Sequence, residues 1–344
     1  MSLDTVLIRS NADLYTPPEI DPMRPHYQPW WTGLLGALVW AALAVLTLMW
    51  ENALVGFSDW AYTQEFGWLA AAVATLLAVA SLVPWVWLPL GMSLRSVGPW
   101  LVAIGFGLTV WEVVTAKFAL LPTPFFAPPQ SLIDVFVSDG LKLVDSAGNS
   151  LVLLAAGIST GALVGFVVGV WIGWSRSANY WIHPVLRVLG PIPTTALLPI
   201  SFYFFPSSWS TAVFLIALGT GFPVAVLTWS GVAGVHKSYY DVARTLGASP
   251  WFLVWRVAIP AALPQVFVGL FMGLGSAFST LVAAEMLGVK SGLGWYLTWS
   301  QGWAAYPNMY GALIIMALLF SGLISLLFLL RDRVLSWQKG TVKW

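Results

Sequence analysis

Long apolar runs, separated by short polar segments, dominate this sequence of 344 residues. About twenty predominantly apolar residues are needed for one helix to cross the apolar part of a bilayer. Runs of about that length occur at residues 31–50, 66–90, 98–121, 149–175, 185–205, 209–233, 263–288 and 308–331. The pattern therefore predicts an all-α, polytopic membrane protein with eight spans, preceded by a polar tail over residues 1–30.

The basic residues indicate which loops lie in the cytoplasm, because Lys and Arg concentrate on that side of a membrane. If the N-terminus lies inside, all but three of the 15 Lys and Arg residues fall on one side. The three exceptions are Lys117, Lys142 and Lys290. This bias predicts that both termini are cytoplasmic and that residues 1–30 form a cytoplasmic tail.

The composition supports a membrane location and excludes several classes of protein. Hydrophobic residues make up 59% of the chain, charged residues only 8%, and the mean hydropathy is +0.82. The net charge of +1 argues against nucleic acid as a partner. The chain has no cysteine, and the spacing of His26, His183 and His236 is not that of metal ligands, so we expect no metal site.

A polar segment between the sixth and seventh runs carries signals for a short helix. Ser238 and Asp241 have the spacing of a capping box, which predicts that a helix starts at Ser238. Gly247 follows the expected last turn and suits the left-handed conformation that ends many helices. Ser249 and Pro250 then have the pattern of a second helix start.

The second helix is expected to run from Trp251 to Ile259 and to end or bend at Pro260 and Pro264. Helices of two or three turns are marginal in water by themselves, so the segment needs a partner. The pattern alone leaves two possibilities open. The segment is either an interfacial helix on the lipid surface or a helix that docks on another protein.

The spacing within this segment resembles a loop of one transporter family. Asp241-Val242-Ala243, three residues, Gly247, nine residues and Val257-x-Ile259-Pro260 is similar to the EAA loop of ABC importer permeases, with the pattern E-A-A, three residues, G, nine residues and I-x-L-P. In that family the loop is the coupling helix that docks on a cytoplasmic ATPase. The resemblance implies a coupling loop over residues 236–262, with ATPase contacts from Asp241, Val242, Ala243, Arg244, Gly247, Val257, Ile259 and Pro260.

Other stretches resemble the nitrate, sulfonate, taurine and bicarbonate branch of these permeases. They are WEVV at 111–114, LLPTP at 120–124, GPIPTTALLPI at 190–200 and AAEMLGVKSGLGWYL at 283–297. The branch usually has Trp-Phe-Gly after the proline-broken helix, and this chain has Phe204-Phe205-Pro206 instead. The resemblance implies a six-helix permease core over residues 98–344 and two additional helices over residues 31–97, for which we expect lipid-facing bracing or a subunit contact.

By this resemblance, the chain is the membrane subunit of an ATP-driven importer in the bacterial inner membrane. Two copies would form the pathway, with a cytoplasmic ATPase dimer on one side and a periplasmic substrate-binding protein on the other. The chain has no G-x-x-x-x-G-K-[ST] motif, so we expect no enzyme activity here and place ATP and Mg on the ATPase. The resemblance implies a small anion such as a sulfonate, taurine, nitrate or bicarbonate as the solute. The same branch also includes importers of heterocyclic vitamin precursors, and in it the binding protein largely sets the specificity, so this alternative stays open.

Prolines predict a break in the fifth run. Pro191, Pro193 and Pro199 each remove a backbone donor that lipid cannot replace, and broken helices often lie on transport pathways. The candidate pathway residues are Thr194, Thr195, Ser279, Glu285 and Glu112. The alternative for the two threonines is structural, with their hydroxyls bound to the carbonyls that the break leaves free.

Glu112 and Glu285 are the two acidic residues that fall within the predicted core spans. A carboxylate inside a membrane is costly unless it is paired or hydrated. Each is a candidate to contact the solute, to anchor a loop, or to serve an ion- or proton-coupled secondary transporter, which is the main alternative function. A third alternative, an intramembrane enzyme, lacks a recognisable set of catalytic residues.

A regular glycine repeat marks the fourth run. Gly157, Gly161, Gly165, Gly169 and Gly173 recur at every fourth position. Small residues at this spacing allow helix backbones to approach closely in lipid. The repeat predicts a tight packing face within the helix bundle rather than a dimer contact.

Overall fold

The computed structural model describes residues 30–53, 60–82, 89–190 and 192–338. All regular elements in these ranges are helices, as the apolar pattern predicts. The chain forms two compact units, residues 1–120 and 121–344. Residues 1–29 of the predicted tail and Pro191 of the predicted helix break lie outside the described residues.

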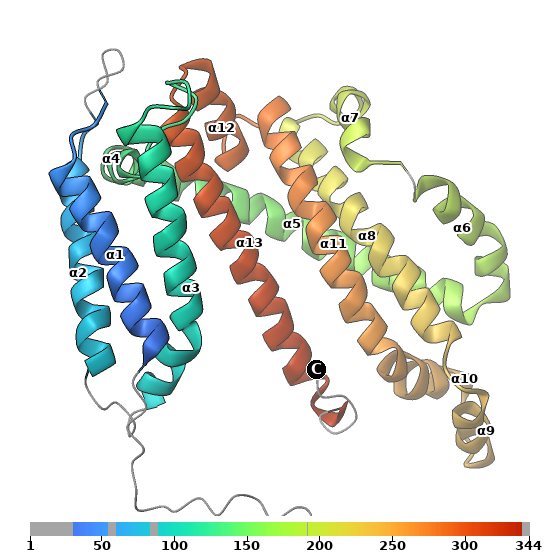
Figure 1. The fold of residues 1–344 in the computed structure, drawn as a ribbon. Coiled ribbons are helices and arrows are strands. Elements are labelled where there is room, and N and C mark those ends of the chain that lie inside the picture. Colours follow the sequence, from blue (N-terminus) through green and yellow to red (C-terminus); the bar gives the residue numbers. More distant parts are fainter. Residues whose placement is uncertain (1–29, 54–59, 83–88, 191, 339–344) are drawn as a thin grey trace, which may run out of the picture. The chain divides into compact units, whose positions relative to one another are not determined.

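The first unit contains α1 (Trp31–Met49), α2 (Thr63–Leu82) and α3 (Pro89–Glu112), and α3 continues as a π turn, η3 (Val113–Lys117). α1 packs against both α2 and α3 (Figure 1). Trp40 of α1 is buried, and its Nε1 donates a hydrogen bond to the Leu101 carbonyl at 2.9 Å. The third span is therefore part of the same unit as the two additional helices.

The boundary between the units lies near Leu120, one helix later than the boundary that sequence resemblance places between residues 97 and 98. The boundary near Leu120 separates two groups of residues that contact one another, whereas the boundary between residues 97 and 98 marks where similarity to the family begins. The division into two additional helices and a six-helix core stays a prediction.

The second unit is built around α5 (Gly140–Trp174), α8 (Ser208–Ala233) and α11 (Ile259–Leu287), which lie side by side (Figure 1). A buried apolar cluster that includes Leu154, Leu215 and Leu281 joins these three helices. The other elements are α4 (Gln130–Ser138), α6 (Arg176–Leu189), η4 (Thr194–Leu197), α7 (Leu198–Phe204), α9 (Lys237–Thr245), α10 (Pro250–Phe252), η5 (Leu253–Ala258), α12 (Leu293–Gly302), α13 (Tyr306–Val334) and η6 (Ser336–Gln338).

Glycines of α5 form the face that meets α8. A Cβ at Gly165 would overlap the backbone of Gly221, and a Cβ at Gly169 would lie 2.6 Å from the Ala225 carbonyl oxygen. Gly157, Gly161 and Gly173 likewise have α8 atoms where a side chain would begin. The glycine repeat thus lies at a contact inside the second unit, where the two backbones approach closely.

Seven helices in the described residues are long and apolar enough to cross a membrane. An eighth crossing is obtained if α6 and the η4–α7 segment count as one span, although these two pieces meet at an angle of 87°. The predicted break in the fifth run is therefore confirmed, and the predicted total of eight spans depends on counting the bent pair as one.

The helix that contains the fourth apolar run starts well before residue 149. The helix begins at Gly140. Its first turns contain polar residues, among them Lys142 and Asp145, which lower the local hydropathy. A helix can extend beyond the apolar layer of the membrane, so the apolar run marks only part of its length.

The second helix of the polar segment does not end at Pro260 or Pro264, so that alternative is wrong, whereas a bend at these prolines stays a prediction. The helix of the seventh span starts before its apolar run, which begins at residue 263. A continuous helical stretch runs over Pro250–Leu287. Pro260 lies in the first turn of α11, directly after the π turn η5, and Pro264 lies inside α11. In the π turn η5, each backbone N–H donates to the carbonyl five residues before it instead of four. This shift accommodates Pro260, which follows the turn and has no N–H to donate.

Candidate functional site

A cavity of about 520 Å³ lies at the helix break, where α6 and η4 face α5, α8 and α11. Its walls are mainly apolar, and no charged residue is among the described residues that line it. Side-chain hydroxyl groups come from Thr160, Thr194 and Ser276. Pockets of 300–1,000 Å³ with apolar walls and a few converging polar groups are typical of small-molecule sites.

Three hydroxyl groups converge around Gly219 of α8. Thr194 Oγ1 lies 2.6 Å from Thr280 Oγ1, and the Thr280 hydroxyl donates to the Ser276 carbonyl at 2.9 Å. Because a threonine hydroxyl has only one proton, Thr194 is the donor in its bond with Thr280. A Cβ on Gly219 would lie 2.9 Å from Ser276 Oγ and 3.4 Å from Thr194 Oγ1. The absence of a side chain at Gly219 therefore leaves the space that the hydroxyl cluster occupies.

The cavity includes only part of the hydroxyl set that the sequence suggests. Thr194 lines it, whereas Thr195 and Ser279 do not, and Ser279 is exposed on α11. Ser276 and Thr280 were not predicted as pathway residues, although they lie four residues apart and so share one face of α11. That spacing is the signal that would have indicated them. Solute contact by Thr194, Thr195 or Ser279 stays a prediction.

Glu285 is buried and holds the segment that follows α11. Its Oε1 accepts a hydrogen bond from Ser150 Oγ at 2.7 Å, and its Oε2 accepts one from the Gly294 backbone N–H at 2.7 Å. Ser150 Oγ in turn accepts from the Leu293 N–H at 2.8 Å. Glu285 does not line the cavity at the helix break. This geometry favours loop anchoring over solute contact for Glu285.

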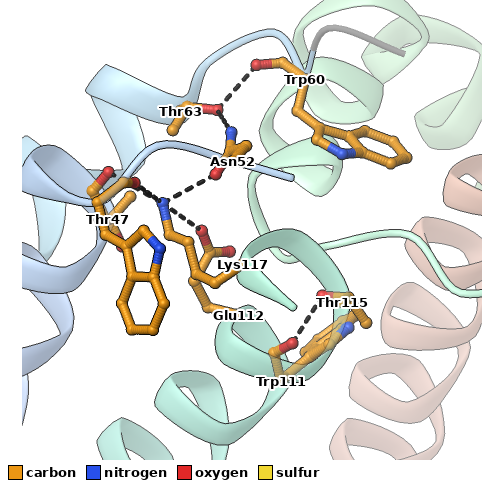
Figure 2. Close-up of polar contacts among 9 residues, drawn as sticks. Thr47, Asn52, Trp60, Thr63, Trp111, Glu112, Thr115 and Lys117 are labelled. Carbon is orange, nitrogen blue, oxygen red and sulfur yellow. Dashed lines mark hydrogen bonds and ion pairs between the residues drawn. The ribbon is translucent and has the colours of Figure 1, made fainter. Parts of the chain in front are cut away.

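Glu112 lies in the first unit and pairs with Lys117. Lys117 Nζ is 3.6 Å from Glu112 Oε1, and both side chains are fully buried. The same ammonium group donates to the carbonyls of Thr47, at 3.3 Å, and Trp50, and to Asn52 Oδ1 at 2.8 Å (Figure 2). Carbonyls at the C-terminal end of a helix have no partner within that helix. Lys117 therefore caps the end of α1.

The network around Lys117 extends to the start of α2 (Figure 2). Asn52 Nδ2 donates to Thr63 Oγ1 at 3.2 Å, and Thr63 Oγ1 donates to the Trp60 carbonyl at 2.8 Å. The Ala53 N–H also donates to the Ala116 carbonyl of the π turn at 2.8 Å. These contacts tie η3 to the segment after α1, and they favour a structural role for Glu112.

The polar segment does begin with a short helix, α9, but its predicted cap is wrong. α9 starts at Lys237, and His236 is its N-cap: His236 Nδ1 accepts from the Ser238 N–H at 3.4 Å. Ser238 consequently lies in the first turn instead of before it. Asp241 lies inside the helix and forms an ion pair with Arg244 at 3.6 Å, so it does not act as a capping carboxylate.

Two other local predictions for this segment are confirmed, the left-handed Gly247 and the helix start at Ser249. Gly247 has φ +84°, the left-handed conformation expected after the last turn. Ser249 caps the next helix, with its side chain accepting from the Phe252 N–H at 3.3 Å. α9 contains no buried residue in this chain, and Val242 and Leu246 are 61% and 83% exposed. The segment thus presents apolar side chains on an uncovered surface.

Comparison with known proteins decides the family. Residues 161–338, which include most of the cavity and the whole of the polar segment, match the model of the binding-protein-dependent transport system inner membrane component. This chain belongs to that family. Among the described residues of the permease, no group of three or more His, Asp or Glu side chains is placed to hold a metal ion.

The permease is similar to several curated proteins over most of their length. It is 30% identical over 247 residues to a probable ABC transporter permease protein of Brucella abortus, covering 72% of this chain and 98% of that protein. It is 31% identical to a putative aliphatic sulfonates transport permease protein of Bacillus subtilis, covering 68% and 85%. It is also 31% identical to a nitrate import permease protein of Synechocystis, covering 70% and 87%. These similarities support the permease function over a secondary transporter.

Proposed function

We propose that this permease forms the membrane pathway of an ATP-driven importer for a small anion of the sulfonate or nitrate kind. A binding protein delivers the solute from the periplasm, and an ATPase dimer lies on the cytoplasmic side. The permease lies in the bacterial inner membrane with both termini in the cytoplasm. The names of its relatives and the bias of its basic residues support this assignment.

The exposed helix α9 carries the proposal that an ATPase binds here. A nine-residue helix is marginal in water, and Val242 within it and Leu246 directly after it leave apolar surface uncovered. Docking in a groove on the ATPase would cover these side chains and stabilise the helix. ATP and Mg then bind to the ATPase. The resulting movement of the ATPase is transmitted by α9 to α8 and α11.

The cavity at the helix break is the proposed lining of the pathway. The described part of the chain carries a single polar segment of the coupling type, so we propose that two copies assemble over an ATPase dimer. Each copy contributes one cavity and one α9. A different permease chain paired with this one in the purified complex would contradict the homodimer.

The test is uptake by the assembled system. The permease is co-expressed with the ATPase and binding protein that its neighbouring genes are expected to encode, and vesicles are assayed with radiolabelled anions. We expect uptake that requires ATP and all three proteins. Uptake by the permease alone, driven by a proton or sodium gradient, would overturn the proposal.

A further inference from the structure

We propose that the cavity at the helix break selects an organic anion with an apolar body, such as an alkanesulfonate, over an inorganic anion such as nitrate. This inference rests on the proposed function, because it takes the cavity to lie on the solute pathway.

The walls of the cavity are apolar on several sides. Val164 comes from α5, Leu189 from α6, Leu197 from η4, and Leu218 and Phe222 from α8. A volume of about 520 Å³ is far more than a nitrate ion needs. Apolar walls favour a solute in proportion to the apolar surface that it brings out of water. A small inorganic anion brings none, so these walls offer it nothing in return for lost hydration.

The polar corner is formed by hydroxyl groups without a charged side chain. Thr194 and Ser276 both line the cavity beside Gly219. The Thr194 proton is used in its bond to Thr280, because the Thr280 proton goes to the Ser276 carbonyl. Among the described residues, Ser276 Oγ has no hydrogen-bond partner, so its hydroxyl proton is available to a solute oxygen. The corner can therefore hold the polar head group of a solute while the apolar walls hold the alkyl body of the same solute.

The polar corner and the apolar walls together fix the orientation of the bound solute. A sulfonate and a nitrate both spread one negative charge over three oxygens, so the hydroxyl corner by itself does not distinguish the two head groups. The alkyl body extends from the corner along α5 and α8. Selection then depends on the length of the apolar body, because the corner by itself has no cation to attract a bare anion.

The test is a binding series on the full-length permease, purified with its ATPase in nanodiscs. Methanesulfonate, propanesulfonate, pentanesulfonate and nitrate are compared by calorimetry at equal ionic strength. We expect Kd to fall roughly fourfold for each added methylene group until the cavity is filled, and nitrate to bind more weakly than pentanesulfonate. ATP hydrolysis by the same preparation reports independently whether the complex is an ATP-driven transporter.

Matched variants locate the binding. Val164 and Val167 both lie on α5 with 55% exposure, but only Val164 lines the cavity. Val164→Trp should remove the dependence of Kd on chain length, whereas Val167→Trp should keep it. Ser276→Ala should weaken all three sulfonates by a similar factor, about fivefold to tenfold, because it removes a donor to the shared head group.

Each result has one meaning. Chain-length dependence that Val164→Trp abolishes and Val167→Trp preserves supports the proposal. Nitrate binding as tight as pentanesulfonate, or chain-length dependence that persists in Val164→Trp, overturns it while leaving the importer intact if ATP hydrolysis is normal. Absence of ATPase binding and ATP hydrolysis would instead contradict the proposed function itself.

Discussion

Lys117 Nζ lies 3.6 Å from Glu112 Oε1, and neither side chain is exposed. Glu112 ends α3 and Lys117 ends the π turn that follows it, and the ammonium group also binds the carbonyls of Thr47, in the last turn of α1, and of Trp50, directly after α1. A single cation thus joins two helices of the first unit. Removing one member of a buried ion pair leaves an uncompensated charge, whereas removing both leaves none.

We expect Lys117→Met to lower the free energy of unfolding by about 3–5 kcal/mol, the range for breaking a buried pair. The double variant Lys117→Met with Glu112→Gln should recover part of that loss, because it leaves no buried carboxylate. The measurement is thermal unfolding of the purified permease in one detergent. If both variants unfold at the temperature of the wild type, the pair has no stabilising role.

The glycine face of α5 gives a second prediction. Gly165→Leu should sharply reduce the yield of folded permease, because a side chain there overlaps the Gly221 backbone. Gly148→Leu is the matched control on the same helix, since no atom lies within 4 Å of a Cβ at that position. The yield of monodisperse protein is measured by gel filtration in detergent. Equal yields for the two variants would show that close α5–α8 contact is unnecessary.

Gly247 provides a test of coupling that spares membrane insertion. Gly247→Val should be strained by about 1 kcal/mol or more at φ +84°, and it should turn the following helix away from α9. Gly247→Asn is the control, because asparagine tolerates this conformation better. We expect the valine variant to reach the membrane normally but to co-purify with little ATPase and to show little uptake. Intact ATPase binding and uptake in Gly247→Val would contradict a coupling role for this loop.

Asp139, which precedes α5, predicts a dependence of stability on pH. Its carboxylate accepts hydrogen bonds from Lys142 at 3.0 Å, Tyr296 at 2.9 Å and Asn308 at 2.8 Å. Burial acts to raise the pKa of Asp139, but these hydrogen bonds outweigh it and hold the pKa below its usual value. Burial also raises the pKa of Tyr296 to about 12, so its hydroxyl remains a donor at neutral pH.

A folded-state pKa below the unfolded value means that Asp139 stabilises the fold above the unfolded pKa, about 4. That contribution is lost as the pH falls through the lower, folded pKa. The melting temperature of the wild type should therefore drop between pH 5 and pH 3 by more than that of Asp139→Asn. If the melting temperatures of the two proteins fall by the same amount over this pH range, Asp139 makes no contribution to the stability.

Features set by neighbours in the chain could be predicted from the sequence. The apolar runs predicted an all-helical membrane protein, and the prolines of the fifth run predicted its break, since hydropathy and backbone donors are local properties. Gly247 and Ser249 predicted the bend and the second helix start for the same reason. The Ser238 prediction failed because His236, a less common cap, accepts the same type of hydrogen bond.

Contacts between distant segments were decided only by the tertiary structure. Thr194 and Thr280 are 86 residues apart, and Ser150 and Glu285 are 135 apart, so no local pattern links them. Lys117 was visible as a single basic residue on the outer side, but its partners come from the end of α1 and the segment after it. The chain fixes which side chains can form hydrogen bonds inside a membrane. Helix packing brings each donor to its acceptor, and it alone determines which of those bonds form.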